Sequence, residues 1–392
     1  MVDFTLNEKE QELIAEIRRA GKVRRKYSRY YDQHEEEIPP EELPEHKEFE
    51  HVDMIKVATT DRGKDASGPT TFGLLSAMHR SWGGGVTLKL PKRALGNASL
   101  AAAGTDEQKK KWGNTILAMA NTEPGAGSDS KNIETTAELN GDEWVLNGEK
   151  IFVTTGIRCE GVVVWATIDR SAGRGGIKAF VVMKDTPGFE LVKKEKKLGI
   201  RSSDTAAFVL KNCHVPRENL LGMKEEVVQK GGGGFKGLMK TFNLTRPGVA
   251  AGGIGNVMAS FDFVTEALKK EGVEVNWEAG QHNRTAIQQK LIDLEAEMEA
   301  ATLTTLYAGW LMDKGKDNNL EASVSKQKGG DICRRGTQMA LEILGAVGIT
   351  HDQDVEQNFR DARITDIYEG TGEIQRLVIA RGILGYSSRD LS

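Results

Sequence analysis

The most constraining feature of this sequence is a run of strand patterns enclosed on both sides by helical patterns. Over residues 135–213, β-branched and aromatic residues alternate with polar ones, which is typical of half-buried strands. The dipeptides Asn140-Gly141 and Asn147-Gly148 are typical of hairpin turns. Because no helical pattern interrupts the run, we expect an antiparallel β-barrel or sandwich here.

Helical patterns occupy the two flanks. Asn7 followed by Glu10 predicts the start of an N-terminal helix, because an asparagine side chain can accept the unpaired amides of the first turn. Residues 92–118 also read as helical. The four glycines at 231–234 are interpreted as a flexible linker.

Three further helices are expected beyond that linker, at 247–270, 284–314 and 322–345. Pro247 is placed in the first turn of its helix, where its missing N–H costs nothing. The predicted class is therefore α+β and multidomain. A helical domain is expected over 1–118, a β domain over 119–230 and a C-terminal four-helix bundle over 231–392.

Composition excludes several classes of protein. A chain of 392 residues exceeds one ordinary domain, and its net charge of −4 gives no reason to expect nucleic acid as a partner. We expect no membrane span, because no run approaches 18 apolar residues. Three widely spaced cysteines argue against a disulfide framework, and no ligand spacing indicates a metal site.

The sharpest local motif is Thr-Glu-Pro-Gly-Ala-Gly-Ser-Asp at 122–129, between a helical segment and the strands. Its proline and glycines favour tight turns with unshielded backbone, and its hydroxyls add donors. Such a loop can surround a polar planar ring or a phosphate with backbone N–H groups. A plain turn connecting two domains is the alternative that the motif alone leaves open.

A second motif places Glu369 at a turn, after Tyr368 and before Gly370. If that carboxylate faces a pocket, desolvation would raise its pKa and make it a stronger base. The alternative that this motif alone leaves open is a solvent-exposed glutamate in an ordinary turn.

Together and in this order, the motifs resemble those of the acyl-CoA dehydrogenase family. The resemblance covers roughly residues 95–255 and 320–386, and five segments carry it: 122–129, 147–154, 198–205, 245–247 and 361–371. It implies an FAD enzyme that oxidises acyl-CoA thioesters to trans-2-enoyl-CoA and passes electrons to an electron-transfer flavoprotein. A homotetramer or hetero-oligomer is implied, cytoplasmic in a bacterium or in the mitochondrial matrix as a mature eukaryotic form.

The resemblance also implies roles for single residues. Glu369 would be the general base, with hydride leaving to flavin N5. The substrate would be bound by Ser128, Asn243, Arg246 and Gly370. The residues implied for the cofactor are Met119, Asn121, Thr122, Gly127, Ser128, Phe152, Thr154, Glu342, Gly345, Thr371 and Glu373.

Three segments depart from the family pattern. Residues 269–274 replace its R-x-T/Q-F-G element, Glu342 replaces a glutamine beside the pyrophosphate, and residues 47–94 lack its usual acyl-pocket segment. The last departure favours an unusual acyl group. The first two keep open the alternative of a flavin-binding subunit of a hetero-oligomer, and an oxidase-type relative that uses oxygen is a further alternative.

Overall fold

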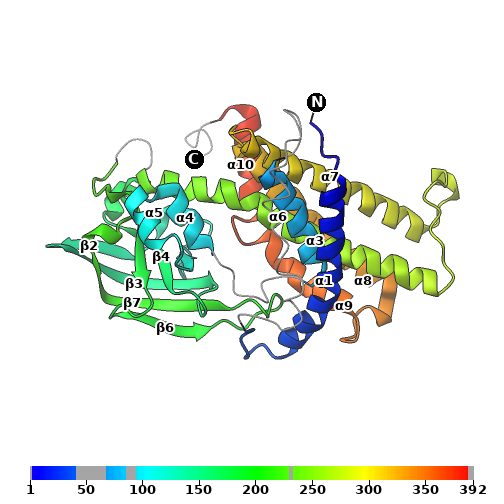
Figure 1. Ribbon diagram of the computed structural model, residues 1–392, viewed down its shortest axis with the longest axis horizontal. Coiled ribbons are helices and arrows are strands. Elements are labelled where there is room, and N and C mark those ends of the chain that lie inside the picture. The colour runs from blue at the N-terminus through cyan, green and yellow to red at the C-terminus, as the bar shows by residue number, and fades with distance from the viewer. Residues whose placement is uncertain (1, 41–67, 85–93, 229–232, 387–392) are drawn as a thin grey trace. The chain divides into compact units, whose positions relative to one another are not determined.

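The computed structural model describes residues 2–40, 68–84, 94–228 and 233–386 (Figure 1). Contacts divide the chain into two compact units. The helical unit comprises Met1–Leu88, Leu198–Ser202 and Arg246–Ser392, and the β unit comprises Lys89–Lys197 and Ser203–Thr245. Two separate chain segments therefore return to the helical unit, so the division into domains 1–118, 119–230 and 231–392 stays a prediction.

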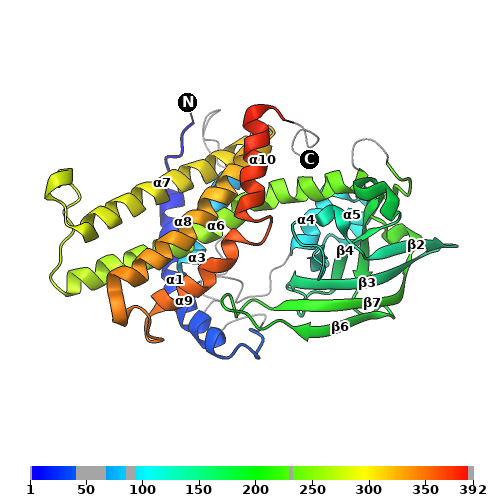
Figure 2. The same ribbon diagram turned by 180° about the vertical axis from the view of Figure 1, so that it is seen from behind.

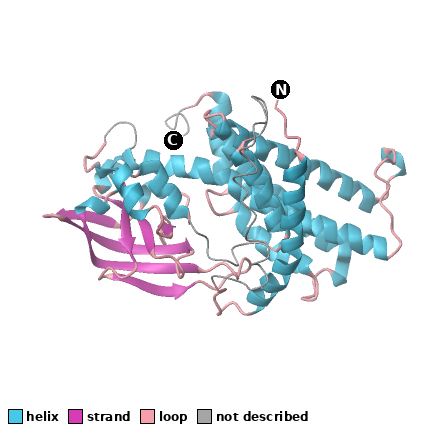
Figure 3. Cartoon of the chain, in the orientation of Figure 1, coloured by secondary structure: helices cyan, strands magenta, loops and turns pink. Residues whose placement is uncertain are grey.

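The β unit is built on one seven-stranded sheet, drawn in magenta in Figure 3. Its strand order is β1-β4-β2-β3-β7-β6, and β5 pairs with β4. Trp144, Leu146, Phe180 and Phe208 are at most 3% exposed and lie in its core. The strands are β1 (Leu117–Ala120), β2 (Thr136–Asn140), β3 (Glu143–Thr154), β4 (Gly161–Thr167), β5 (Ile177–Met183), β6 (Phe189–Lys194) and β7 (Thr205–Pro216).

The predicted β domain is confirmed, with two differences in its details. The turn at Asn140-Gly141 is a hairpin: Asn140 pairs with Glu143, and Gly141 has a φ of +63°. The second predicted hairpin is wrong, because Asn147 and Gly148 lie inside β3 at a register shift against β7. A Cβ at Gly148 would come within 2.4 Å of the Thr135 hydroxyl oxygen. Glycine is therefore needed here because Thr135 approaches the strand closely, and not because the chain reverses direction.

The sheet is also not wholly antiparallel. Strand β1 pairs in parallel with β4, from Leu117 opposite Gly161 to Ala120 opposite Val164. Residues 117 and 118 were predicted to be helical. A short apolar run buried on both faces carries no periodicity that separates strand from helix. The true helices of this stretch are α4 (Leu95–Ala103) and α5 (Asp106–Trp112).

The helical unit is built from long helices (Figure 2). Their main apolar core includes Met78, Ile254, Leu291 and Ile332, and a smaller one joins α1 to Phe72. The predicted start at Asn7 is confirmed, because Asn7 and Glu10 form a reciprocal capping box. Asp313 at the end of α7 accepts the backbone amides of Thr70 and Thr71 at the start of α3. The long helices are α1 (Glu8–Gln33), α3 (Pro69–Trp82), α6 (Gly233–Lys270), α7 (Ala286–Asp313) and α8 (Asn319–Leu344), and the shorter ones are α9 (Asp354–Ala362) and α10 (Gly372–Leu384). The first part of α6, up to Thr245, belongs to the β unit.

The predicted start of α6 is wrong. The helix begins at Gly233, and Pro247 lies inside it. Pro247 has no N–H to donate, so one internal hydrogen bond of the helix is missing at this point. The predicted glycine linker at 231–234 lies partly outside the described residues, and its last two glycines begin the helix. None of the described helices has the length and apolarity needed to cross a bilayer.

Candidate active site

A buried ion pair fixes the loop at 122–129 within the β unit. The Lys150 ammonium lies 2.6 Å from a Glu123 carboxylate oxygen, and the two side chains are 0% and 4% exposed. Glu123 also accepts the backbone amides of Glu134 and Thr135, while Lys150 donates to the Asn121 carbonyl at 3.1 Å. The loop is thus held from its inner side by four charge-assisted hydrogen bonds.

The protonation states of the pair follow from these contacts. Burial lowers the pKa of Lys150 to about 8, against the opposite pull of the Glu123 carboxylate. Burial raises the pKa of Glu123, but the Lys150 charge and the hydrogen bonds outweigh it and hold that pKa below its usual value. Both groups are therefore charged at neutral pH.

The outer side of the loop is open. Glu123 and Ala126 exchange two backbone hydrogen bonds of 3.1 Å, which close a tight turn. Gly127 and Ser128 are exposed, and a Cβ added at Gly127 would meet nothing within 4 Å. A rigid turn with exposed backbone is suited to contacting a flat or anionic ligand.

The end of β3 displays an aromatic ring beside that loop. Phe152 is 59% exposed and has a φ of +56°, at a register shift between Lys150 and Val153. A left-handed conformation costs a residue of this kind about 1–3 kcal/mol and is concentrated at functional sites. The carbonyl of Thr122 accepts the amide of Ile151 at 2.9 Å, so the loop and the strand carrying Phe152 are directly joined.

The turn after β3 is held by a second buried carboxylate. Asp204 is 1% exposed, contacts the Arg158 guanidinium at 2.7 Å and accepts the amide of Ile157 at 2.8 Å. Thr154 pairs with Thr205 of β7. The position of Thr154 is thus set by the sheet on one side and by the Asp204 turn on the other.

Three predicted cofactor residues precede the loop or begin it. Met119 lies on β1, where its sulfur accepts the Ser99 hydroxyl at 3.3 Å, and Thr122 is half-buried. Asn121 is 8% exposed, and among the described residues its side-chain oxygen has no donor. A buried acceptor without a donor is costly, so a ligand that carries an N–H group fits this position. Asn243, predicted to bind substrate, lies half-buried on α6.

The predicted base lies in the helical unit on a strained turn. Glu369 has a φ of +59° and Gly370 a φ of +88°, so two consecutive residues are left-handed. The Glu369 carbonyl accepts the Arg246 guanidinium at 3.4 Å and the Gln375 amide at 3.3 Å. Gln375 also donates to the Gly370 carbonyl at 3.0 Å. The strained backbone is therefore held from two helices, and the Glu369 side chain is half-buried.

Two buried cations lie behind this turn. Arg246 is 5% exposed and its guanidinium lies 3.4 Å from the Ser323 hydroxyl. Lys326 is 0% exposed, and its electrostatic neighbours include Asp366, Arg246 and Glu369. Sequence reasoning found Arg246 but missed Lys326.

The last four predicted cofactor residues divide into two places. Thr371 caps α10 by accepting the Ile374 amide at 3.3 Å, and Glu373 lies exposed in the first turn of that helix. Glu342 lies near the other end of α8, exposed and paired with Lys290 at 3.3 Å, and Gly345 ends the helix with a φ of +59°. Sixteen residues of helix separate Glu342 from Lys326, roughly 24 Å, so Glu342 is remote from the base turn. Its pairing with Lys290 offsets the repulsion that a lone carboxylate would exert on a phosphate.

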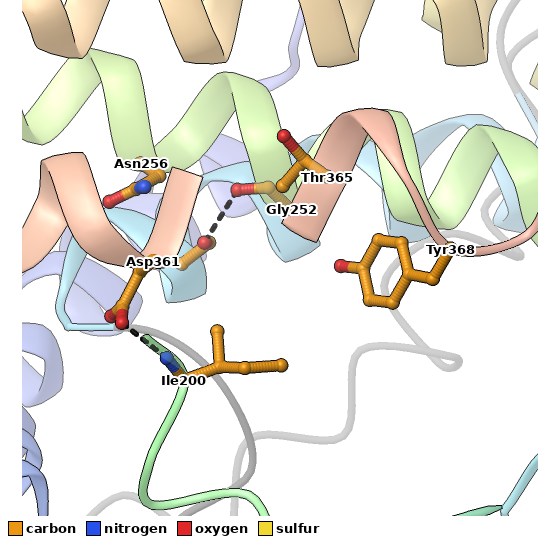
Figure 4. A pocket seen from close by; sticks show the side chains of 7 residues that line it. Ile200, Gly252, Asn256, Asp361, Thr365 and Tyr368 are labelled. Carbon is orange, nitrogen blue, oxygen red and sulfur yellow. Dashed lines mark hydrogen bonds between the residues drawn. The ribbon is translucent and has the colours of Figure 1, made fainter. Parts of the chain in front are cut away.

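A small cavity is lined by Tyr368, which precedes the predicted base, and by residues of other elements (Figure 4). Its volume is about 40 Å³, which suits one or two water molecules and not a flavin or an acyl chain. The Asp361 carboxylate accepts the amide of Ile200 there, and burial raises the pKa of Asp361 to about 7. The lining residues are Ser81, Ile200, Gly252, Asn256, Asp361, Thr365 and Tyr368.

Comparison with known proteins decides the family. The chain matches "Acyl-CoA dehydrogenase, middle domain" over residues 118–213 and "Acyl-CoA dehydrogenase, C-terminal domain" over residues 232–384. It is 39% identical over 287 residues to the short-chain specific acyl-CoA dehydrogenase of Rattus norvegicus mitochondria, covering 72% of this chain and 67% of that protein. The chain belongs to the acyl-CoA dehydrogenase family. It is thus a flavoprotein oxidoreductase of a family that uses FAD.

Further relatives of this acyl-CoA dehydrogenase confirm the fold and widen the range of reactions. The butyryl-CoA dehydrogenase of Megasphaera elsdenii has a TM-score of 0.80 at 28% identity and covers 98% of this chain and 100% of its own. A 3-(aryl)acrylate reductase of Clostridium sporogenes is 34% identical over 84% of this chain and 86% of its own. The family and the fold class expected from the sequence are therefore confirmed. The roles of individual site residues stay predictions.

Proposed function

We propose that this protein removes two hydrogens from the α and β carbons of an acyl-CoA thioester, giving the trans-2-enoyl-CoA, with Glu369 as the general base. The observation that carries the proposal is the Glu369–Gly370 turn, two left-handed residues held by Arg246 and Gln375. The strain lies at Glu369, since glycine adopts a positive φ freely. Such strain persists only where the surroundings hold it in place, and it is concentrated at catalytic positions.

The residues of the β unit fit a flavin. The fixed loop at 122–129 leaves exposed backbone, Asn121 has a buried oxygen that lacks a donor among the described residues, and Phe152 displays its ring beside them. Thr371 and Glu373 are the candidates from the helical unit. FAD supplies the acceptor for the hydride that leaves the β-carbon. That the two groups of residues meet across one bound flavin and thioester is part of the proposal.

The chain's own residues would then carry out the proton transfer. The Glu369 carboxylate takes the α-proton, and a positioned base of this kind contributes roughly 10²–10⁴-fold in rate. The backbone amide of Glu369 would donate to the thioester oxygen as negative charge develops there, and loss of one such donor typically costs about 10²–10³-fold. Arg246, Asn243 and Ser128 would orient the substrate.

Partners are proposed from the surface and from relatives. Leu377, Ile383 and Leu384 on α10 are 52–69% exposed, an apolar face that a second subunit would cover. We therefore propose an oligomer, as a homotetramer or with a second kind of subunit. An electron-transfer flavoprotein is the proposed acceptor. A solved structure described as the electron transferring flavoprotein of Acidaminococcus fermentans shares this fold at a TM-score of 0.77 and 29% identity.

Reduction of an activated acrylate is the second candidate. The 3-(aryl)acrylate reductase named above and an acryloyl-CoA reductase of Anaerotignum propionicum, 37% identical over 289 residues, support it. The same residues serve either direction, because a base that takes the α-proton during oxidation returns it during reduction.

Anaerobic mixing with acyl-CoA thioesters tests the proposal and separates the two directions. A panel of short, long, branched and carboxylated acyl groups is mixed with the FAD-loaded protein while the visible absorbance of the flavin is followed. Bleaching by a saturated acyl-CoA supports dehydrogenation. Re-oxidation of the dithionite-reduced protein by an enoyl-CoA, without bleaching of the oxidised protein by the corresponding saturated acyl-CoA, supports the reductase. If neither change occurs with any member of the panel, the proposed reaction is wrong.

A further inference from the structure

The middle of helix α8 contains a lysine whose burial no surface role explains. The Lys326 side chain is 0% exposed, and among the described residues its ammonium has no hydrogen-bond partner. Burying a cation without a partner is expensive, and such groups usually shift to their neutral form or bind an opposite charge. A methionine would fill the same volume at much lower cost, so the charge itself needs a reason.

The charges around Lys326 come from the base turn and from three further elements. Asp366 ends the short helix Arg363–Asp366, Arg246 comes from α6, Glu369 lies on the turn and Glu373 begins α10. One Asp366 oxygen is also buried without a hydrogen-bond partner in the described part of the chain. Lys326 is therefore a cation that faces three carboxylates and one guanidinium, and one of these carboxylates is the proposed base.

The other two helices packed on α8 direct their polar groups elsewhere. From α7, the Thr305 hydroxyl meets the Ser325 hydroxyl at 2.9 Å, which is a neutral contact, and the Glu297 carboxylate pairs with Lys328 and Arg335. From α9, Arg360 pairs with Asp32 and with Glu356 on its own helix. The field that Lys326 creates is thus directed mainly at the 366–373 segment.

Lys326 stays mostly charged at neutral pH. Burial lowers its pKa to about 8, against the pull of Asp366. At pH 7 roughly nine molecules in ten then carry the proton. Bulk solvent does not reach Lys326, Ser323 or Gln375, which are all 0% exposed, so the Lys326 charge is weakly screened there.

We propose that Lys326 is a positioning residue for Glu369: its buried ammonium, balanced by Asp366, keeps the catalytic carboxylate ionised when the acyl chain displaces water around it. This inference rests on the proposed function of Glu369. The physical need is specific. A base must be ionised to accept a proton, yet an apolar substrate favours its neutral form. A fixed positive charge opposes that change, and Asp366 prevents it from weakening the base too far.

The pH dependence of flavin reduction tests this role in the FAD-loaded protein. Lys326→Met and Lys326→Gln remove the charge, and each should raise the apparent pKa on the acidic limb of the reduction rate by about one unit. Lys326→Arg keeps the charge and should restore most of the original profile. Lys328→Met is the matched control, because Lys328 lies two residues away on the same helix and pairs with Glu297 at 3.5 Å; its profile should match the unmodified protein.

The outcomes separate this inference from the function on which it rests. If Glu369→Gln abolishes flavin reduction while both neutral Lys326 variants keep the original profile, the reaction stands and the role of Lys326 is wrong. If Glu369→Gln reduces flavin at the normal rate, the proposed function fails, and the role of Lys326 fails with it. A slower rate at every pH without a shifted limb also overturns the inference, because loss of packing alone would produce it.

Discussion

Lys150→Met should strongly destabilise the β unit. The ammonium and the Glu123 carboxylate are 2.6 Å apart, and both side chains are almost fully buried. Removing one partner of such a pair leaves an uncompensated buried charge, which typically costs about 3–5 kcal/mol. Glu123 keeps its two backbone amide donors, so we expect a loss of about 3 kcal/mol, at the lower end of that range.

A double-mutant cycle isolates the pair. Glu123→Gln combined with Lys150→Met leaves no buried charge, and the glutamine oxygen can still accept one of the backbone amides. The double variant should therefore recover at least half of the stability that Lys150→Met loses. Urea unfolding followed by circular dichroism measures the free energy of unfolding of Glu123→Gln, Lys150→Met and the double variant. Flavin titration of the folded proteins measures whether the loop at 122–129 still supports flavin binding.

Two results would refute this reasoning. A loss below about 1 kcal/mol for Lys150→Met would place the pair in the range of exposed ion pairs, in contradiction to its burial. Additive losses in the double variant would mean that Glu123 and Lys150 do not interact. In either case the loop would need another anchor.

Three further predictions follow from single contacts. The pKa of Asp361, about 7 in the folded protein, lies above its unfolded value of about 3.9, so the stability that this carboxyl contributes is present below about pH 4 and is lost as pH rises through 7. Asp361→Asn should flatten this dependence of stability on pH and melt at a higher temperature than the unmodified protein at pH 8. A shift in melting temperature that is the same at every pH would contradict this prediction. Phe152→Gly should relieve a φ of +56° and change stability by no more than about 1 kcal/mol, while flavin titration shows weaker binding; unchanged flavin affinity would remove Phe152 from the site. Asp313→Ala removes the cap that accepts the Thr70 and Thr71 amides and should cost about 1–2 kcal/mol in urea unfolding, and an unchanged midpoint would show that the cap carries no stability.

Local signals predicted the fold where neighbouring residues decide the structure. The Asn7–Glu10 capping box and the Asn140-Gly141 hairpin each involve only a few consecutive residues. The failures depend on distant residues. Asn147-Gly148 reads as a turn, but the close approach of Thr135, the residue before β2, requires a glycine inside β3. Pro247 reads as a helix start, but α6 continues through it.

The candidate site was predicted unevenly for the same reason. Lys150 could have been found, because in β3 it follows Trp144 and Leu146 on the inward-facing even positions, where a lysine requires a buried carboxylate. Lys326 and Asp361 carried no such signal. Lys326 meets the base turn about 40 residues later in the chain, and Asp361 is desolvated beside Ile200, 161 residues away. Contacts across such separations are set by packing and not by local pattern.

The most direct test of the central claim compares Glu369→Gln with Glu299→Gln. Glu299 lies exposed on α7 and is not among the residues proposed for the site, so both variants lose one carboxylate of the helical unit. Each FAD-loaded protein is mixed anaerobically with the acyl-CoA that bleaches the unmodified protein fastest. We predict that Glu369→Gln binds the thioester but loses flavin reduction by at least about 10²-fold, whereas Glu299→Gln keeps a rate near normal. Normal bleaching by Glu369→Gln would contradict the account.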